Sequence, residues 1–190
     1  MSGIAARILN AFGIRLALEK LEKARVQSQN LWLSRKMKGF GKGSYLKGRV
    51  EISHPEVVCI GENSCLDEGT KLRGTGTITI GNNVRAGENL FVISDNHDYE
   101  GEELPYGKTR IKKPVKIGNN VWIGSNVTIL GGAAVGEGAV IGVGSVVVKD
   151  VPACAVVAGN PAQVKKFRDK KKYERLKAEK KFNSKKNLWR

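Results

Sequence analysis

The chain contains two histidines, and one of them stands where it could act as a general base. His97 lies in the segment SDNHDY, between Asp95 and Asp98. An imidazole titrates near neutral pH and can take a proton from a substrate hydroxyl, and a neighbouring carboxylate can orient the ring or raise its basicity. A solvated loop histidine is the competing interpretation. His54 is interpreted as structural, because it lies next to a proline at a corner between two repeats.

Motifs for other common chemistries are missing from the sequence. It has no GxSxG nucleophile elbow, no P-loop and no GxGxxG between a strand and a helix. Cys59, Cys65 and Cys154 are odd in number and form no CxxC pair, which argues against a disulfide framework and against a zinc knuckle. Two histidines 43 positions apart do not supply a zinc ligand set, so no metal is expected.

The elements that position His97 are predicted from a six-residue repeat. An aliphatic residue recurs at every sixth position, and a small or β-branched residue follows four positions after each. The recurring residues of the later block are Ile117, Ile123, Ile129, Val135, Ile141, Val147 and Ala153. An earlier block runs through Ile60, Leu66, Leu72 and, after a two-residue slip, Ile80, Ala86 and Val92.

A period of six fits neither an amphipathic helix nor an alternating strand of an open sheet. Hexapeptide units are typical of a stacked solenoid, so the sequence predicts an all-β fold, a parallel β-helix. Each unit supplies one short strand and one corner, where Gly or Asn tolerates positive φ, and three units close a triangular coil. A narrow interior also agrees with an aromatic content of only 6%.

One long interruption breaks the repeat, and other patterns flank the repeat at both ends. We expect an extruded loop near 96–116, and a loop of this length in a solenoid is usually functional. Helical spacing is found at 4–25 and, among many lysines, at 163–182. The expected domains are therefore an N-terminal helical, basic segment at 1–49, the β-helix at 50–162 and a C-terminal basic helix or tail at 163–190.

Positive charge is concentrated at the two ends of the chain. The net charge is +15, divided into +9 for 1–49, −4 for 50–163 and +10 for 164–190. An acidic body argues against nucleic acid as a partner. No apolar run approaches the length of a membrane span and the N-terminus lacks a cleavable signal, so we expect a cytoplasmic protein. The basic ends could contact anionic lipid at the inner membrane face, or they could simply be solvated.

The stretch from Ile93 to Arg168 resembles the hexapeptide-repeat acyltransferases, especially the branch with galactoside, maltose and bacterial polysaccharide O-acetyltransferases. The resemblance is carried by DNHDY around His97, PVKIGNNVWIGSNVTILGG at 114–132, IGVGSVVVKDVP at 141–152 and AGNPAQVKKFR at 158–168. It implies that the β-helix is left-handed. It also implies a homotrimer with active sites between subunits, and acetyl-CoA as the acyl donor, lying in the groove between adjacent prisms.

The same resemblance assigns roles to individual residues. His97 would be the general base of a direct transfer, without an acyl-enzyme. Asp95 or Asn89 would serve on the acceptor side, because the stretch LRGTGTITI lacks the acidic or amide residue often found there. The residues expected to contact acetyl-CoA are Trp122, Ser125, Gly142, Val143, Lys149, Lys165, Lys166 and Arg168.

The function expected from these observations is acetyl-CoA-dependent O-acetylation of a sugar or glycan hydroxyl, such as one on a capsule or lipopolysaccharide precursor. One alternative is N-acetylation of an amino sugar, which uses the same fold. A second alternative belongs to another class. In it the β-helix is a non-catalytic scaffold that binds anionic lipid or polymer through its basic ends, and His97 is dispensable.

Overall fold

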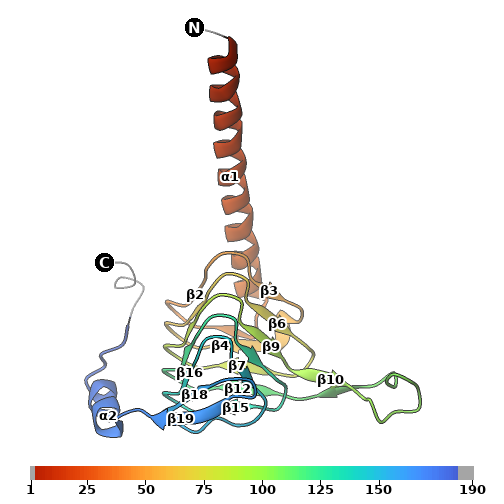
Figure 1. Cartoon of the computed structure of the whole chain (residues 1–190), viewed down its shortest axis with the longest axis vertical. Helices are drawn as coiled ribbons and strands as arrows, with labels where there is room; N and C mark the ends of the chain where they lie inside the picture. The colour runs from red at the N-terminus through yellow and green to blue at the C-terminus, as the bar shows by residue number, and fades with distance from the viewer. Residues whose placement is uncertain (1–2, 184–190) are drawn as a thin grey trace.

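A three-sided parallel β-solenoid forms the body of the protein (Figure 1). The structure is a computed structural model that describes residues 3–183. Successive coils add one strand to each of three sheets, which we call sheets A, B and C. Sheet A holds β1 (Gly39–Phe40), β4 (Val58–Ile60), β7 (Ile78–Ile80), β12 (Val115–Ile117) and β15 (Ala134–Val135). Sheet C holds β3 (Glu51–Ile52), β6 (Lys71–Arg73), β9 (Phe91–Ile93), β14 (Thr128–Ile129) and β17 (Val146–Val147).

Sheet B is the longest of the three. It holds β2 (Tyr45–Leu46), β5 (Cys65–Leu66), β8 (Arg85–Ala86), β13 (Trp122–Ile123), β16 (Val140–Ile141), β18 (Ala155–Ala158) and β19 (Gln163–Phe167). The chain runs from A to B to C and back to A, so each coil has corners A–B, B–C and C–A. A short 3₁₀ helix, η1 (Pro55–Val57), lies in the C–A corner between β3 and β4.

The interior is filled by the aliphatic residues of the six-residue repeat. Every predicted ladder position from Ile60 to Val147 is at most 4% exposed. Ala153, predicted as the next position, is exposed, so this part of the prediction was wrong. Residues 152–154 form a turn, and Val151 and Ala155 occupy the interior instead.

Corner A–B carries a ladder of asparagines. Asn63, Asn83 and Asn120 have φ of 51°, 56° and 58°, a left-handed conformation that Asn tolerates better than most residues. The Nδ2 of Asn63 donates to Asn83 Oδ1 at 2.8 Å, and Asn83 Nδ2 donates to Asn120 Oδ1 at 3.0 Å. Asn120 then donates to the hydroxyl of Tyr173 in the C-terminal helix at 3.0 Å.

The N-terminal helix is longer than the spacing at 4–25 predicts. α1 spans Gly3–Lys36 and projects away from the prism (Figure 1). Its last turns cover the first coil, where Leu33 is buried and Asn30 donates to Leu46 O and Gly48 O. Regular coils begin at β1, before the expected domain start at residue 50, because β1 and β2 already pair with β4 and β5.

The interruption at 96–116 contains a β-hairpin. β10 (Asp95–His97) pairs antiparallel with β11 (Arg110–Lys112), and the hairpin projects from corner C–A (Figure 1). At the C-terminus, the helix α2 spans Lys170–Ala178, whereas Gln163–Phe167 form β19 antiparallel to β18 rather than the start of a helix. Asp169 caps α2 by accepting from Lys172 N. In the part of the chain that the structure describes, no helix is long and apolar enough to cross a membrane.

The asparagine ladder predicts an order of stability for two variants at residue 83. Both Asn83→Gly and Asn83→Ala lose the hydrogen bonds to Asn63 and Asn120. Alanine also pays left-handed strain of roughly 1–2 kcal/mol, which exceeds the extra chain entropy of glycine. We therefore expect Asn83→Gly to have the higher free energy of unfolding, by about 1 kcal/mol, in urea denaturation followed by circular dichroism. Equal stability of the two variants would contradict a role for the positive φ.

Candidate active site at the hairpin

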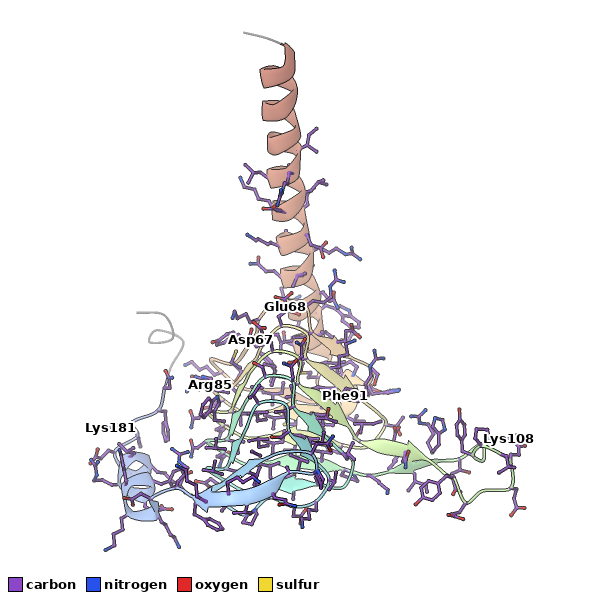
Figure 2. The ribbon with its side chains drawn as sticks, viewed as in Figure 1. Asp67, Glu68, Arg85, Phe91, Lys108 and Lys181 are labelled. Carbon is purple, nitrogen blue, oxygen red and sulfur yellow. The ribbon has the colours of Figure 1, made fainter. Side chains whose placement is uncertain are left out.

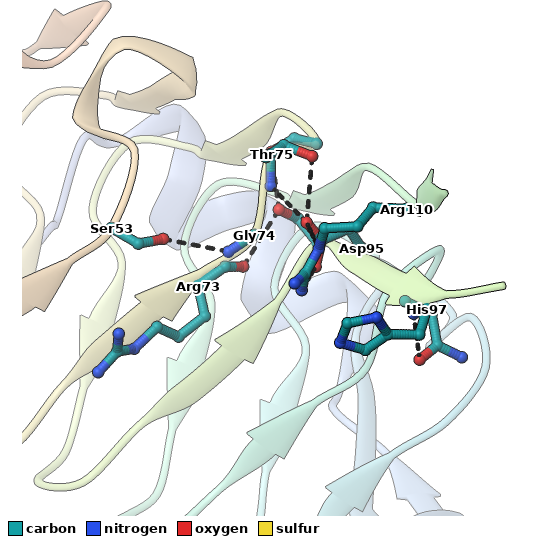
Figure 3. Close-up of polar contacts among 10 residues, drawn as sticks. Ser53, Arg73, Gly74, Thr75, Asp95, His97 and Arg110 are labelled. Atoms are coloured by element: carbon teal, nitrogen blue, oxygen red, sulfur yellow. Dashed lines mark hydrogen bonds and ion pairs between the residues drawn. The ribbon is translucent and has the colours of Figure 1, made fainter. Parts of the chain in front are cut away.

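The hairpin grows out of corner C–A between β9 and β12. Its cross-strand pairs are Asp95 with Lys112, Asn96 with Ile111 and His97 with Arg110. Side chains of alternate residues in a strand point to the same face, and directly paired residues share it. Asp95, His97 and Arg110 therefore lie on one face at the base of the hairpin (Figure 3).

Asp95 is buried at the root of the hairpin, with 2% of its surface exposed. Its carboxylate accepts from Arg110 Nη2 at 2.8 Å and Nε at 3.1 Å, and from Thr75 N at 2.8 Å and Oγ1 at 3.1 Å (Figure 3). Thr75 lies in the two-residue slip that follows Leu72. A Cβ added at Gly74, whose φ is +106°, would come within 2.9 Å of Asp95 N. The two-residue insertion at Gly74 and Thr75 therefore packs closely against Asp95 and binds its carboxylate.

These bonds lower the pKa of Asp95 to about 2, mainly through the hydrogen bonds from Arg110, and Asp95 in turn raises the pKa of Arg110. The carboxylate is ionised at neutral pH, and both of its oxygens are occupied. Among the described contacts of Asp95 there is none to the imidazole of His97. Its observed contacts fix the hairpin to the prism, whereas the sequence analysis assigned it to the acceptor side.

The ring of His97 is half-buried and lies against an aromatic side chain that the sequence analysis missed. Tyr106 stacks on it with ring centroids 3.8 Å apart and an interplanar angle of 23°. Tyr106 lies nine positions after His97 in the sequence, in a segment without periodicity. The only available signal was an aromatic residue in a functional loop.

Four of the predicted site residues lie along corner B–C: Asn89, Ser125, Gly142 and Val143. Asn89 Nδ2 donates to Asn126 Oδ1 at 3.0 Å, and Gly144 N donates to Ser125 O at 2.9 Å, so three successive coils are joined there. Val143 is 70% exposed at this edge. The structure thus brings these residues together, but on a different corner from His97.

The remaining predicted residues are spread over other surfaces. Trp122 is 59% exposed on the outer face of sheet B. Across the strands of this sheet it lies in line with Val140, Val156 and Lys166. Lys166 and its neighbour Lys165 belong to β19, the last strand of the sheet. Lys149 is exposed at corner C–A. Arg168 lies near corner A–B, where it donates to Gly138 O at 3.1 Å and its guanidinium lies 5.1 Å from the centre of the Tyr173 ring.

Sheet B also carries a cavity of about 510 Å³ between the prism and α2. It is lined by Trp122 and by Arg85, which precedes Trp122 in the same column, and Lys181 lies on the same side of the molecule (Figure 2). The Nε of Arg85 is buried without a hydrogen-bond partner. Arg85 is not among the residues predicted from the sequence, although it occupies the same repeat position as Trp122, five residues after an interior aliphatic residue.

Other chemistry is disfavoured in the residues that the structure describes. Burial raises the pKa of the Cys65 and Cys154 thiols, so little thiolate is available from them for nucleophilic attack at neutral pH. Within residues 3–183, no group of three His, Cys, Asp or Glu residues is arranged to hold a metal ion.

Comparison with known proteins agrees with this architecture. Residues 114–149 match the family model described as bacterial transferase hexapeptide (six repeats). A putative acetyltransferase of Dictyostelium discoideum is 32% identical over 78% of this chain and 74% of its own length. The chain belongs to the hexapeptide-repeat acyltransferase family. Its predicted fold, a left-handed parallel β-helix, is thereby confirmed.

Two members of the family show how far the similarity reaches. The galactoside O-acetyltransferase of Escherichia coli strain K12 is 31% identical over 65% of this chain, and the match spans 61% of that protein, less than two thirds of its length. A galactoside acetyltransferase solved in complex with coenzyme A superposes with a TM-score of 0.65 and is 32% identical, covering 74% of this chain and 70% of that one.

The lowered pKa of Asp95 predicts a pH-dependent contribution to stability. We expect Asp95→Asn to lower the free energy of unfolding by about 2 kcal/mol at pH 7. The depressed pKa means that the contribution is complete above about pH 4 and is lost as the pH falls through about 2, so the two proteins should converge there. Urea denaturation at a series of pH values measures this difference.

Glu19→Gln is the matched control, because Glu19 pairs with Arg15 at an exposed site on α1 and its loss should cost less than about 0.5 kcal/mol. A difference between wild type and Asp95→Asn that stays constant down to pH 2 would contradict the assignment of this carboxylate.

Proposed function

We propose that the protein is an acetyl-CoA-dependent O-acetyltransferase that acts on a hydroxyl of a sugar or glycan, with His97 as the general base. Membership of the acyltransferase family supports the reaction class. The observation that carries the assignment of His97 is its half-buried position at the base of the one hairpin that interrupts the described coils. The relatives named as galactoside acetyltransferases support a sugar acceptor.

The chemistry follows from the weak acidity of a sugar hydroxyl. His97 takes the hydroxyl proton as the oxygen attacks the thioester carbonyl, and the resulting imidazolium returns that proton to the sulfur of the departing thiol. The acetyl group moves directly, so no residue of the chain is acylated. Holding both substrates together supplies much of the acceleration.

We further propose that each active site forms between subunits of a homotrimer. His97 lies at corner C–A and the proposed acetyl-CoA edge, including Ser125 and Val143, lies at corner B–C, so the two are separated by the width of sheet C. Asn89 and His97 belong to the same coil, at opposite ends of β9. A neighbouring prism turned by one third of a revolution would bring corner C–A of one chain to corner B–C of the next.

Residues on the other surfaces could extend this groove. Trp122 offers a flat apolar surface for pantetheine, and Gly142 lets the donor approach the backbone closely. Lys149, Lys165, Lys166 and Arg168 supply charge for the phosphates of CoA. The hydrogen bond that Asp150 accepts from Ala134 N supports this role for Lys149, because it engages the carboxylate next to Lys149 in the sequence.

The location of the reaction remains the one predicted from the sequence, in the cytoplasm with peripheral contact at the inner membrane face. Exposed lysines of α2, such as Lys170, Lys171 and Lys172, support contact with anionic headgroups. A capsule or lipopolysaccharide precursor would present its sugar at that surface. Amino-sugar N-acetylation and a non-catalytic scaffold are the competing functions.

His97→Ala tests the proposed function, with His54→Ala as the matched control. Thiol release from acetyl-CoA is measured with a panel of sugars, amino sugars and glycans. We expect His97→Ala to lower kcat by roughly 10²–10⁴-fold, because general-base catalysis is worth about that much. The control should retain wild-type turnover, since the imidazole of His54 pairs with Glu56 at an exposed site. Wild-type activity in His97→Ala would refute the mechanism, and preference for an amine would favour N-acetylation.

Mixed trimers test the location of the site between subunits. Val143→Glu should inactivate by filling the donor groove without affecting the fold, because Val143 is exposed. When His97→Ala and Val143→Glu chains are co-expressed and assemble at random, roughly a quarter of the interfaces should be active. In these interfaces the intact His97 of one chain faces the intact Val143 of the other. Light scattering should give three times the chain mass of 20.7 kDa. No recovery in a proven mixed trimer would place the site within one chain.

A further inference from the structure

We propose that Tyr106 is a positioning residue that fixes the imidazole of His97, and that the Asp95–Arg110 ion pair holds the hairpin on which both rings lie. This inference rests on the proposed role of His97 as the base. The stacking distance of 3.8 Å is close to van der Waals contact between two flat rings, and the interplanar angle of 23° makes their overlap nearly parallel.

Fixing the ring plane matters for the chemistry. A base must receive the proton along the direction of its nitrogen lone pair, which lies in the plane of the imidazole. An unsupported ring at a half-exposed site turns about the bond to Cβ and is aligned only part of the time. Tyr106 covers one face of the ring and leaves its edge, with the nitrogens, available to the acceptor hydroxyl.

The hairpin is folded so that this contact can form. Asp98 O accepts from both Gly101 N and Gly107 N, which turns the chain back toward β10. A Cβ at Gly101 would come within 2.8 Å of Gly107 Cα, so the two backbones meet where only glycine fits. The turn places Tyr106, next to Gly107, against His97.

The root of the hairpin is held by charge. Arg110 lies directly opposite His97, and its guanidinium reaches the buried carboxylate of Asp95, which also accepts from Thr75 of the preceding coil (Figure 3). This pair ties the return strand to the prism. Asp95 thus acts on His97 through the backbone of the hairpin, and none of its described contacts is with the imidazole.

Kinetics of three variants separate positioning from general damage. We expect Tyr106→Ala to lower kcat roughly 10- to 100-fold, while its KM for acetyl-CoA stays within about twofold of wild type. Tyr106→Phe keeps the stack and should retain most of the turnover. Tyr99→Ala is the matched control, because Tyr99 is an exposed tyrosine of the same hairpin and should leave kcat unchanged.

Nuclear magnetic resonance reports the stack independently of activity. The chain has two histidines, so the carbon-bound ring protons give two sets of signals, and His97→Ala identifies those of His97. The ring current of Tyr106 should shift the His97 signals upfield in wild type and in Tyr106→Phe. In Tyr106→Ala these signals should move downfield while those of His54 stay in place.

The outcomes distinguish this inference from the proposed function. Loss of kcat together with loss of the ring-current shift, both restored by Phe, supports the positioning role. Unmoved His97 signals in Tyr106→Ala, full turnover of that variant, or failure of Phe to rescue would each overturn it while His97→Ala stays inactive. Wild-type activity in His97→Ala would overturn the base and its positioning together.

Discussion

The structure depends on one geometric constraint: each short strand must bond to the coil before it and the coil after it. Strands of two or three residues have no stability alone, and only a ladder of backbone hydrogen bonds repeated at the inter-strand spacing holds them. Because every corner must fall above the previous corner, the chain must turn at fixed intervals. The six-residue period in the sequence follows from that requirement. The interior has room for only one layer of side chains, which explains why aliphatic residues fill it.

The same constraint determines where new parts can be added. β12 pairs with β7 in full register although the whole hairpin lies between them in sequence. An insertion can therefore leave the prism only at a corner and must return to the same corner. The hairpin is such an excursion, and the candidate base lies where it leaves the regular coils. A rigid frame thus presents a side chain whose immediate surroundings are free to vary.

At the root of the hairpin, electrostatics compensates for the loss of regular pairing. A carboxylate that is almost fully buried is costly unless it is paired and hydrogen-bonded. Asp95 meets both conditions through Arg110 and Thr75, which belong to the hairpin and to the preceding coil. The pair therefore joins an irregular element to a regular one. Two extra residues at corner C–A of the preceding coil supply the backbone donor that makes this possible.

The sequence predicts the periodic part of the molecule well and the contacts between irregular segments poorly. Interior positions from Ile60 to Val147 follow from spacing alone, because the ladder permits one pattern. Ala153 fails where the last coil turns early, and Gln163–Phe167 form a strand because an open sheet edge is available to them. The stack of Tyr106 on His97 depends on a fold that no repeat encodes. The six-residue period predicts the corner at which each site residue lies. It does not predict which residues of other segments contact that corner.

The two ends of the solenoid carry a consequence for the behaviour of the protein at high concentration. A parallel ladder that ended in bare strands would offer unpaired backbone groups to another molecule and could grow end to end. At the start of the ladder, α1 lies over the first coil, and at the other end β19 runs antiparallel to β18, while Ala162 N donates to Val146 O along the edge of sheet C. A reversed strand cannot continue a parallel stack in register. The terminal elements thus cap the solenoid and prevent end-to-end polymerisation into fibres, which the repeats themselves cannot do.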